Sequence, residues 1–166
     1  VERSRGLGDV YKRQVLACRG RTFMAGADIT EFASGVKQPW LGEVIDTMSE
    51  SSKVIVAAIF GTTFGGGLEV ALGCNYRIAD SNTKIGLPEV KLGIIPGAQG
   101  TQRLSRVSSV EFALKLATLG NPVGAQEALE AGAIDKISNG ELIDDAVSYA
   151  EAVSYTHLRA HETSLH

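Results

Sequence analysis

Apolar runs alternate with amphipathic segments along the first half of the chain. Residues 15–18 (VLAC) form a short apolar run that predicts a strand. Residues 53–60 (KVIVAAIF) are apolar and rich in β-branched side chains after Lys53, which predicts a strand buried on both faces. Between these runs, the apolar positions 41, 44, 45 and 48 predict an amphipathic helix over residues 41–51.

The same alternation continues to residue 153. Residues 84–97 contain a glycine or proline every few positions, which predicts a rigid, irregular loop of the kind that often carries function. Gly132 follows an expected helix at the position that favours glycine. The remaining pattern predicts strands over residues 76–79 and 133–137, and helices over residues 68–75, 101–119, 125–131 and 141–153. Because strands and helices alternate, we expect an α/β fold with a mostly parallel sheet.

The two ends of the chain lack this periodicity. Residues 1–14 and 154–166 resemble translated sequencing-adapter read-through, and we expect both segments to be non-native. Residues 15–153 would then form a partial domain. A competing interpretation of the tail is a metal site, because His157 and His161 lie one helical turn apart. The pair lacks the further ligands at metal-site spacing that a structural zinc site needs, so we expect no metal.

Composition narrows the class of protein. A chain of 166 residues that is 44% hydrophobic and 21% charged is typical of a single globular domain. Residues 15–153 keep 11 of the 16 basic and 16 of the 19 acidic residues, and this net charge of −5 disfavours nucleic acid as a partner. No apolar run is long enough for a membrane span. We expect a cytoplasmic protein if the source is bacterial, and a mitochondrial or peroxisomal one if it is eukaryotic.

The positions of the cysteines and histidines exclude several kinds of catalytic and metal site. Cys18 and Cys74 are far apart and match no metal or redox spacing. All three histidines fall within the last ten residues, so residues 15–153 contain none. Catalytic triads that depend on histidine are therefore excluded there, and acid–base chemistry must fall to carboxylates, lysines or tyrosines.

A glycine-rich loop follows the buried strand and leads into a helix. Residues 65–67 are all glycine, and they allow a ligand to approach the backbone without meeting a Cβ. A helix N-terminus offers unpaired N–H groups and partial positive charge, so this loop suits a phosphate or a developing oxyanion. The lysine and hydroxyl of a phosphate-binding P-loop are missing. The alternative is that these small residues serve only close packing of strand and helix.

Two carboxylates lie in apolar surroundings. Glu69 follows the glycines on a helix whose other residues are almost all apolar, so it lies either on a solvated stripe or in a site. Glu89 lies in the proline-stiffened stretch 86–90, where a solvated loop side chain is the simpler interpretation. Together with the glycine loop, the two carboxylates suit general acid–base chemistry on a carbonyl compound.

Four sequence blocks resemble those of one enzyme family. Residues 25–29 (AGADI), 65–69 (GGGLE), 86–89 (GLPE) and 96–104 (PGAQGTQRL) resemble the signature blocks of the crotonase, or enoyl-CoA hydratase/isomerase, family, in the family's order. The likeness covers residues 15–153 and is greatest to hydratase domains of bifunctional enoyl-CoA hydratase/3-hydroxyacyl-CoA dehydrogenases. It implies the crotonase-like (ClpP/crotonase) ββα spiral core, truncated at both ends.

The resemblance also implies catalytic roles. The N–H groups of Ala27 and Gly66 would form an oxyanion hole for the thioester oxygen. Glu69 would be the base for the attacking water, and Glu89 would protonate C2. The implied reaction is syn hydration of a 2-enoyl-CoA in fatty-acid β-oxidation. We expect the truncated segment itself to be a poor catalyst.

Further binding residues and partners follow from the same likeness. Asp28 would hold the oxyanion loop, and Ala25 would lie near the CoA adenine. No cofactor would be needed beyond the CoA of the acyl-CoA substrate. The parent protein is expected to be a homo-oligomer or to be fused to a dehydrogenase domain.

One departure and two alternatives accompany this prediction. Gln99 stands where many family members have glycine. Within the family, the alternatives are a 3-enoyl-CoA Δ3-Δ2 isomerase or another acyl-CoA enzyme such as a hydrolase or lyase. Outside enzymes, the alternative is an inactive acyl-CoA-binding or assembly module. Two glutamates favour hydration over isomerisation, which can proceed with one.

Overall fold

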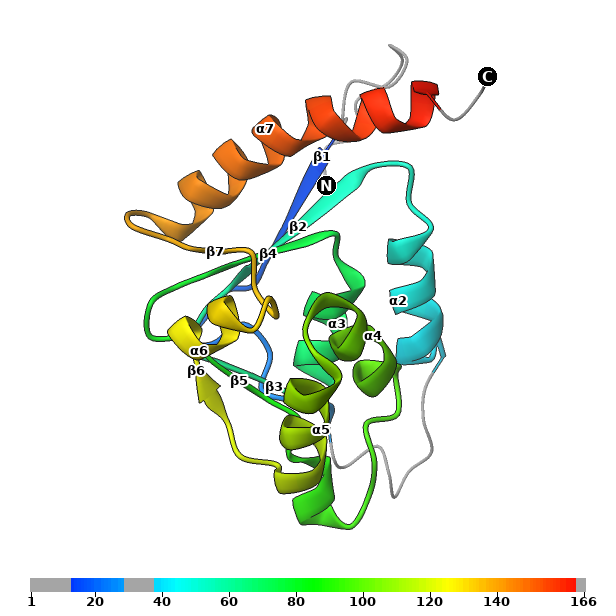
Figure 1. Cartoon of the computed structure of the whole chain (residues 1–166), viewed down its shortest axis with the longest axis vertical. Coiled ribbons are helices and arrows are strands. Elements are labelled where there is room, and N and C mark those ends of the chain that lie inside the picture. The colour runs from blue at the N-terminus through cyan, green and yellow to red at the C-terminus, as the bar shows by residue number, and fades with distance from the viewer. Residues whose placement is uncertain (1–12, 29–37, 164–166) are drawn as a thin grey trace.

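A four-stranded parallel sheet organises the molecule (Figure 1). The computed structural model describes residues 13–28 and 38–163, with side chains as far as residue 153. The sheet contains β1 (Arg13–Ala17), β2 (Val54–Ile59), β4 (Tyr76–Ala79) and β7 (Lys136–Ile137), in that spatial order. All three pairings are parallel, which confirms the expected α/β class with a mostly parallel sheet.

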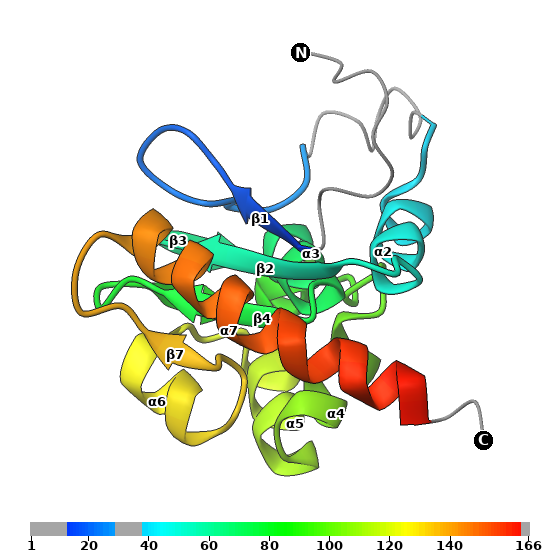
Figure 2. The ribbon, with the colours of Figure 1, turned by 90° about the horizontal axis from the view of Figure 1, so that it is seen from above.

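Strand β2 is buried on both faces because different layers cover its alternate side chains. Helix α7 (Leu142–Thr163) runs across β1, β2 and β4 on one face, and the other helices lie on the opposite side of the sheet (Figures 1 and 2). Val54, Val56 and Ala58 pack toward α7, where they meet Ala146 and Ala150. The alternate residues Ile55, Ala57 and Ile59 belong to the second, larger core. The continuous apolar run of β2 therefore follows from its central position in the sheet.

A second, smaller sheet was not expected from the sequence. It consists of β3 (Thr62–Phe64), β5 (Lys84–Gly86) and β6 (Val123–Gly124), with β5 parallel to β3 and antiparallel to β6. The sequence predicted an irregular loop over residues 84–97 and no strand over residues 62–64 or 123–124. Strands of two or three residues are too short to show alternation of apolar and polar positions, so pairing rather than pattern defines them.

The helices follow the predicted pattern with two differences. The structure has α2 (Leu41–Ser49), α3 (Gly66–Gly73), α4 (Gly100–Val107), α5 (Val110–Leu119) and α6 (Ala125–Glu130). The expected single helix over residues 101–119 is wrong, because the chain breaks between α4 and α5. Ser108 is extended, and the Ser109 side chain accepts the N–H of Phe112 at 3.1 Å as the N-cap of α5.

Helix α7 differs at its C-terminal end. The sequence predicted a helix that ends at residue 153, whereas α7 continues to Thr163. Its first half carries the buried Ala146 and Ala150 that cover the sheet. We expected residues 1–14 and 154–166 to be non-native, yet Arg13 and Gln14 belong to β1 and pair with Val54 and Ile55, and Arg13 forms an ion pair with Glu151 at 2.6 Å. Residues 1–12 and the side chains after residue 153 lie outside the described part of the chain.

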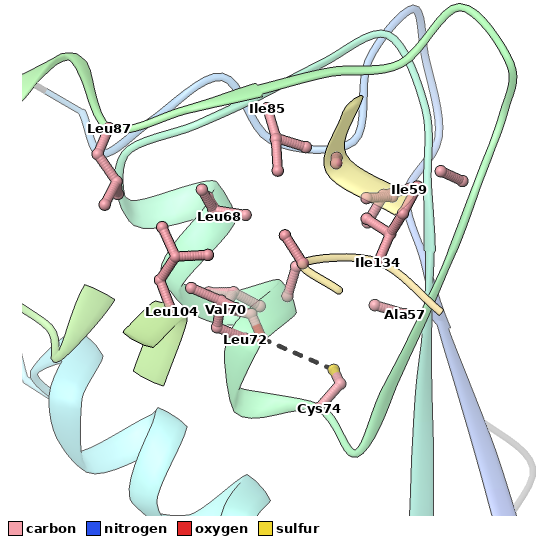
Figure 3. Close-up of a cluster of buried hydrophobic side chains, with 14 of the residues drawn as sticks. Ala57, Ile59, Leu68, Val70, Leu72, Cys74, Ile85, Leu87, Leu104 and Ile134 are labelled. Carbon is pink, nitrogen blue, oxygen red and sulfur yellow. Dashed lines mark hydrogen bonds between the residues drawn. The ribbon is translucent and has the colours of Figure 1, made fainter. Parts of the chain in front are cut away.

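The larger core surrounds α3 (Figure 3). Every residue of this helix from Gly67 to Gly73 is buried. Leu68 and Leu72 pack among Ile59, Ile85 and other apolar side chains from both sheets and from α4. A helix enclosed on all sides has no solvated stripe, so any ionisable group on it must lie in a cavity or be paired.

Arg77 on β4 is a buried charge with a full set of partners. Its guanidinium donates to the carbonyl oxygens of Cys74 and Ala133, both at 3.0 Å. It also pairs with Oδ2 of Asp135 at 2.9 Å, and the same oxygen accepts the backbone N–H of Arg77 at 2.7 Å. These bonds join the end of α3 to the segment that precedes β7.

Candidate active site

One cavity of about 630 Å³ gathers every residue that the sequence singled out for chemistry. Its wall includes the segment that follows β1, the first turn of α3, η1 (the 3₁₀ helix Pro88–Leu92), and residues 94–98. The six predicted site residues all line it: Ala25, Ala27, Asp28, Gly66, Glu69 and Glu89. Segments that are far apart in the sequence thus meet at one place.

Glu69 enters the cavity from the first turn of α3. The residue is only 3% exposed, and its Oε1 accepts the backbone N–H groups of Ala98 and Gly100, each at 2.8 Å. Burial raises the pKa of this carboxyl, and the two backbone hydrogen bonds lower it in part. Within the described part of the chain, no donor bonds the second oxygen, Oε2. The two amides therefore hold the carboxylate by one oxygen only.

Glu89 reaches the same cavity from η1. Pro88 begins this short helix, and Glu89 is 9% exposed. Its Oε2 is buried and has no hydrogen-bond partner among the described residues. Burial raises the pKa of Glu89 most, its own backbone N–H lowers it, and the negative charge of Glu69 raises it further. Both effects that raise the pKa favour a protonated Glu89.

The glycine loop is shaped by contacts that a side chain would prevent. A Cβ on Gly67 would lie 2.1 Å from the carbonyl oxygen of Met24, so α3 packs directly against the chain after β1. Gly65 has a φ of +51°, and a Cβ there would lie 2.8 Å from Oε1 of Glu89. Close backbone packing, the simpler interpretation of these glycines, is therefore part of their role.

The same packing brings the two proposed oxyanion donors together. The Cβ position of Gly66 lies 3.5 Å from the backbone nitrogen of Ala27. Phe64 donates its N–H to the carbonyl oxygen of Met24 at 3.1 Å, and this bond holds the chain at Met24 against β3 of the small sheet. Gly66 is the first residue of α3, and the first N–H groups of a helix have no partner within the helix. This corner of the cavity can therefore receive a negatively charged oxygen.

Ala25 and Asp28 lie on the exposed rim of the cavity. Both residues are exposed, whereas Glu69 and Glu89 are buried, so they lie at the entrance of the cavity. The chain immediately after Asp28 lies outside the described residues.

Two groups of residues were missed by the sequence analysis. Apolar side chains form one wall of the cavity: Trp40, Leu41, Val44, Leu92, Ile94 and Ile95. The second group is the pair of amides from Ala98 and Gly100 that hold Glu69. Ala98 and Gly100 belong to a sequence block, whereas most of the apolar wall lies outside the blocks and predicted helices, and only the tertiary fold brings both groups to the cavity.

Other kinds of site are not found in the described part of the chain. Among the described side chains, those of residues 13–28 and 38–153, no three His, Cys, Asp or Glu gather as metal ligands. No described helix is both long and apolar enough to cross a membrane. The side chains of His157 and His161 lie outside this part. Cys74 is buried, bonds the carbonyl oxygen of Val70 at 3.6 Å (Figure 3), and has a pKa raised by burial to about 12.

Comparison with known proteins identifies the family. The model that describes enoyl-CoA hydratase/isomerase matches residues 8–165. The chain belongs to the enoyl-CoA hydratase/isomerase family. This result confirms the resemblance drawn from the four sequence blocks.

Several members of the enoyl-CoA hydratase/isomerase family resemble the chain closely. It is 48% identical over 136 residues to the human peroxisomal bifunctional enzyme, a match that covers 80% of this chain and 18% of that protein. It is 41% identical over 142 residues to the fatty acid oxidation complex subunit alpha of Idiomarina loihiensis, covering 80% of this chain and 20% of that subunit. Relatives of this kind confirm the predicted likeness to bifunctional enzymes.

Solved structures of the same family confirm the fold. The crystal structure of an enoyl-CoA hydratase from Bacillus anthracis has a TM-score of 0.79 and 34% sequence identity to the chain. The match covers 89% of this chain and 60% of that one. The chain thus spans about a fifth of the length of these two longer relatives and 60% of this hydratase.

Proposed function

We propose that the chain carries the hydratase site of a fatty-acid β-oxidation enzyme, which adds water across the C2–C3 double bond of a 2-enoyl-CoA. The single observation that carries the proposal is that two buried carboxylates, held by different backbone hydrogen bonds, line one cavity. Glu69 accepts two backbone N–H groups, whereas Oε2 of Glu89 has no partner in the described structure. The names of the relatives, which include a fatty acid oxidation subunit, support the same pathway.

The hydrogen bonds support a different role for each carboxyl group. Burial raises the pKa of Glu69, but the bonds from two N–H groups stabilise its ionised form, so we assign the role of base to Glu69. A buried, unpartnered oxygen beside that charge favours the proton-bearing form of Glu89. Hydration needs this combination of one base and one acid on the same face of the substrate.

The proposed reaction proceeds as follows. The water oxygen bonds to C3 while Glu69 takes a proton from that water. The electrons of the double bond move toward the thioester oxygen, which accepts hydrogen bonds from the N–H groups of Ala27 and Gly66, each worth about 3–4 kcal/mol in the transition state. Glu89 then gives its proton to C2. Exchange with solvent returns a proton to Glu89 and removes one from Glu69, so the enzyme is regenerated.

Cofactor, partners and location belong to the same proposal. The proposed steps use only these side chains and amides, so the CoA of the substrate is the only cofactor we propose. A relative named a bifunctional enzyme, of which this chain covers 18%, supports a parent protein fused to a dehydrogenase domain. Because the relatives include a peroxisomal enzyme and bacterial proteins, we propose a peroxisomal location for a eukaryotic source and a cytoplasmic one for a bacterial source.

Product analysis tests the reaction type. The full-length protein that contains this chain is incubated with crotonyl-CoA in ¹⁸O-labelled water, and separately with a 3-enoyl-CoA. A hydratase yields a 3-hydroxyacyl-CoA that carries the label at C3. Formation of 2-enoyl-CoA from the second substrate, without hydration of the first, would instead assign an isomerase. Binding of both thioesters without any product would assign an acyl-CoA-binding module.

A further inference from the structure

Gln99 lies between the two residues whose amides hold Glu69. Ala98 and Gly100 donate to Oε1 of Glu69, and Gln99 is the single residue that separates them. Gln99 has φ 73° and ψ 16°, and it is the only non-glycine residue with positive φ in the described parts of the chain. The backbone at Gln99 is thus left-handed, and the residues on its two sides present their amides to the same oxygen of Glu69.

This conformation is unfavourable for a residue with a side chain. Residues other than glycine, asparagine and aspartate rarely adopt it, because their Cβ comes too close to the following carbonyl oxygen. Such a conformation persists when the surrounding structure holds it, and it is found most often at functional sites. A glycine at this position would adopt the turn without any support, so a glutamine must contribute something that offsets its own strain.

The Gln99 side chain is held in a closed ring of hydrogen bonds. Its Nε2 donates to Oδ1 of Asp46 at 2.8 Å, and its Oε1 accepts from Nε of Arg103 at 3.1 Å. Nη2 of Arg103 pairs with the same Asp46 oxygen at 3.3 Å. Asp46 lies on α2 and Arg103 on α4, so the ring joins two helices across the turn. Charged partners make such hydrogen bonds stronger than neutral ones.

We propose that Gln99 is a positioning residue: its side chain, anchored by Asp46 and Arg103, fixes the left-handed turn that presents the amides of Ala98 and Gly100 to Glu69. The inference rests on the proposed function, because it assigns Gln99 a role in the reaction only if Glu69 is the base. It acts through the backbone, since Gln99 itself does not line the cavity.

The charges near Glu69 determine how this role can be measured. Glu89 on η1 and Asp28 on the rim share the cavity with Glu69, and the Asp46–Arg103 pair lies beyond the turn. Only Ala98 and Gly100 donate hydrogen bonds to the Glu69 carboxylate within the described chain. If the turn loosens, the ionised form loses stabilisation and the pKa of Glu69 rises. The acidic limb of the plot of kcat/KM against pH reports the pKa of Glu69 in the free enzyme.

Gln99→Gly separates positioning from folding. Glycine accepts the left-handed turn, so the variant should fold with little change in Tm. Without the side-chain ring, we expect kcat for hydration to fall about 3- to 10-fold, as for partial loss of a hydrogen bond to a charged group. KM should stay nearly constant, and the acidic limb of kcat/KM should move to higher pH. The measurement is made on the full-length protein with crotonyl-CoA.

Variants of Asp46 test the other end of the ring. Asp46→Ala removes the anchor and should reproduce the fall in kcat and the shifted acidic limb. Asp46→Asn keeps an oxygen that can accept from Gln99 and should restore most of the rate. Glu50→Ala is the matched control, because Glu50 is an exposed carboxylate on the same side of the sheet, directly after α2. This control should behave as the wild type.

The outcomes distinguish this inference from the proposed function. A Gln99→Gly protein with wild-type kcat and an unmoved acidic limb overturns the positioning role, provided that Glu69→Gln is inactive in the same assay. A fall in rate accompanied by an equal loss in Glu50→Ala would overturn it as well. If Glu69→Gln keeps the wild-type rate, the proposed function itself fails, whatever Gln99 does.

Discussion

The backbone of Gly100 and the carboxylate of Glu69 meet so closely that no side chain fits between them. The N–H of Gly100 lies 2.8 Å from Oε1 of Glu69, and a Cβ on Gly100 would lie 2.9 Å from both Cγ and Oε1 of that residue. The N-terminus of α4 therefore approaches α3 directly at the proposed base. This contact fixes both the position of Glu69 and the hydrogen bonds that favour its charge.

Gly100→Ala should displace the Glu69 carboxylate. Real Cβ atoms do not tolerate such a contact, so Glu69 must move, and a displacement of about 1 Å can lower kcat by about 100-fold. Steady-state hydration of crotonyl-CoA measures the loss. Gly124→Ala is the control, because a Cβ there meets nothing within 4 Å. Equal rates in the two variants would contradict the account of this contact.

Glu89→Gln should stabilise the folded protein at neutral and alkaline pH. Because the pKa of Glu89 is raised above its ordinary value of 4.5, the folded state holds this proton more tightly than the unfolded state. Wild-type stability therefore falls as pH rises from about 4.5 through the folded-state pKa. The glutamine does not titrate and avoids this loss.

Urea unfolding at several pH values measures the effect. The free energy of unfolding of Glu89→Gln should equal that of the wild type near pH 4 and exceed it near pH 8. Glu69 is present in both proteins, and Glu50→Gln, at an exposed position, provides the control. A stability difference that is the same at both pH values would show that ionisation of Glu89 is not its cause.

Arg77→Met should destabilise the fold without touching the cavity. The substitution removes the guanidinium from three carbonyl oxygens and from Asp135, which keeps only the backbone N–H of residue 77 among its described partners. Since Asp135 is partly accessible to water, we expect a loss of about 2–3 kcal/mol in the free energy of unfolding, the lower end for a broken buried pair. Lys115→Met breaks the exposed pair with Glu127 and should cost less than about 1 kcal/mol. Similar losses of unfolding free energy in the two variants would contradict the claim that burial makes the Arg77 pair the stronger one.

The large elements could be predicted because their burial leaves a pattern in the sequence. Strand β2 is apolar throughout since α7 and α3 cover its two faces, and α2 shows the spacing of a helix with one buried side. The strands β3, β5 and β6 left no such pattern, because they are two or three residues long. The break before α5 depends on one capping serine, which periodicity does not detect.

The site residues could be named individually, but their environment could not. Glu69 and Glu89 stand out as carboxylates in apolar stretches, and both line the cavity. Which amides hold Glu69 depends on how α4 packs against α3, a tertiary contact. The left-handed turn at Gln99 was visible only as a departure from the family's glycine. Its anchor on α2 lies 53 residues away in the sequence.

Single substitutions of the two carboxylates test the central claim most directly. In the full-length protein, Glu69→Gln and Glu89→Gln are assayed for hydration of crotonyl-CoA, and binding of a saturated acyl-CoA is measured by calorimetry. We expect each variant to lose about 10²- to 10⁴-fold in kcat, as for removal of a general acid or base, with binding largely retained. Wild-type hydration by either variant would contradict the account of two carboxylates acting together.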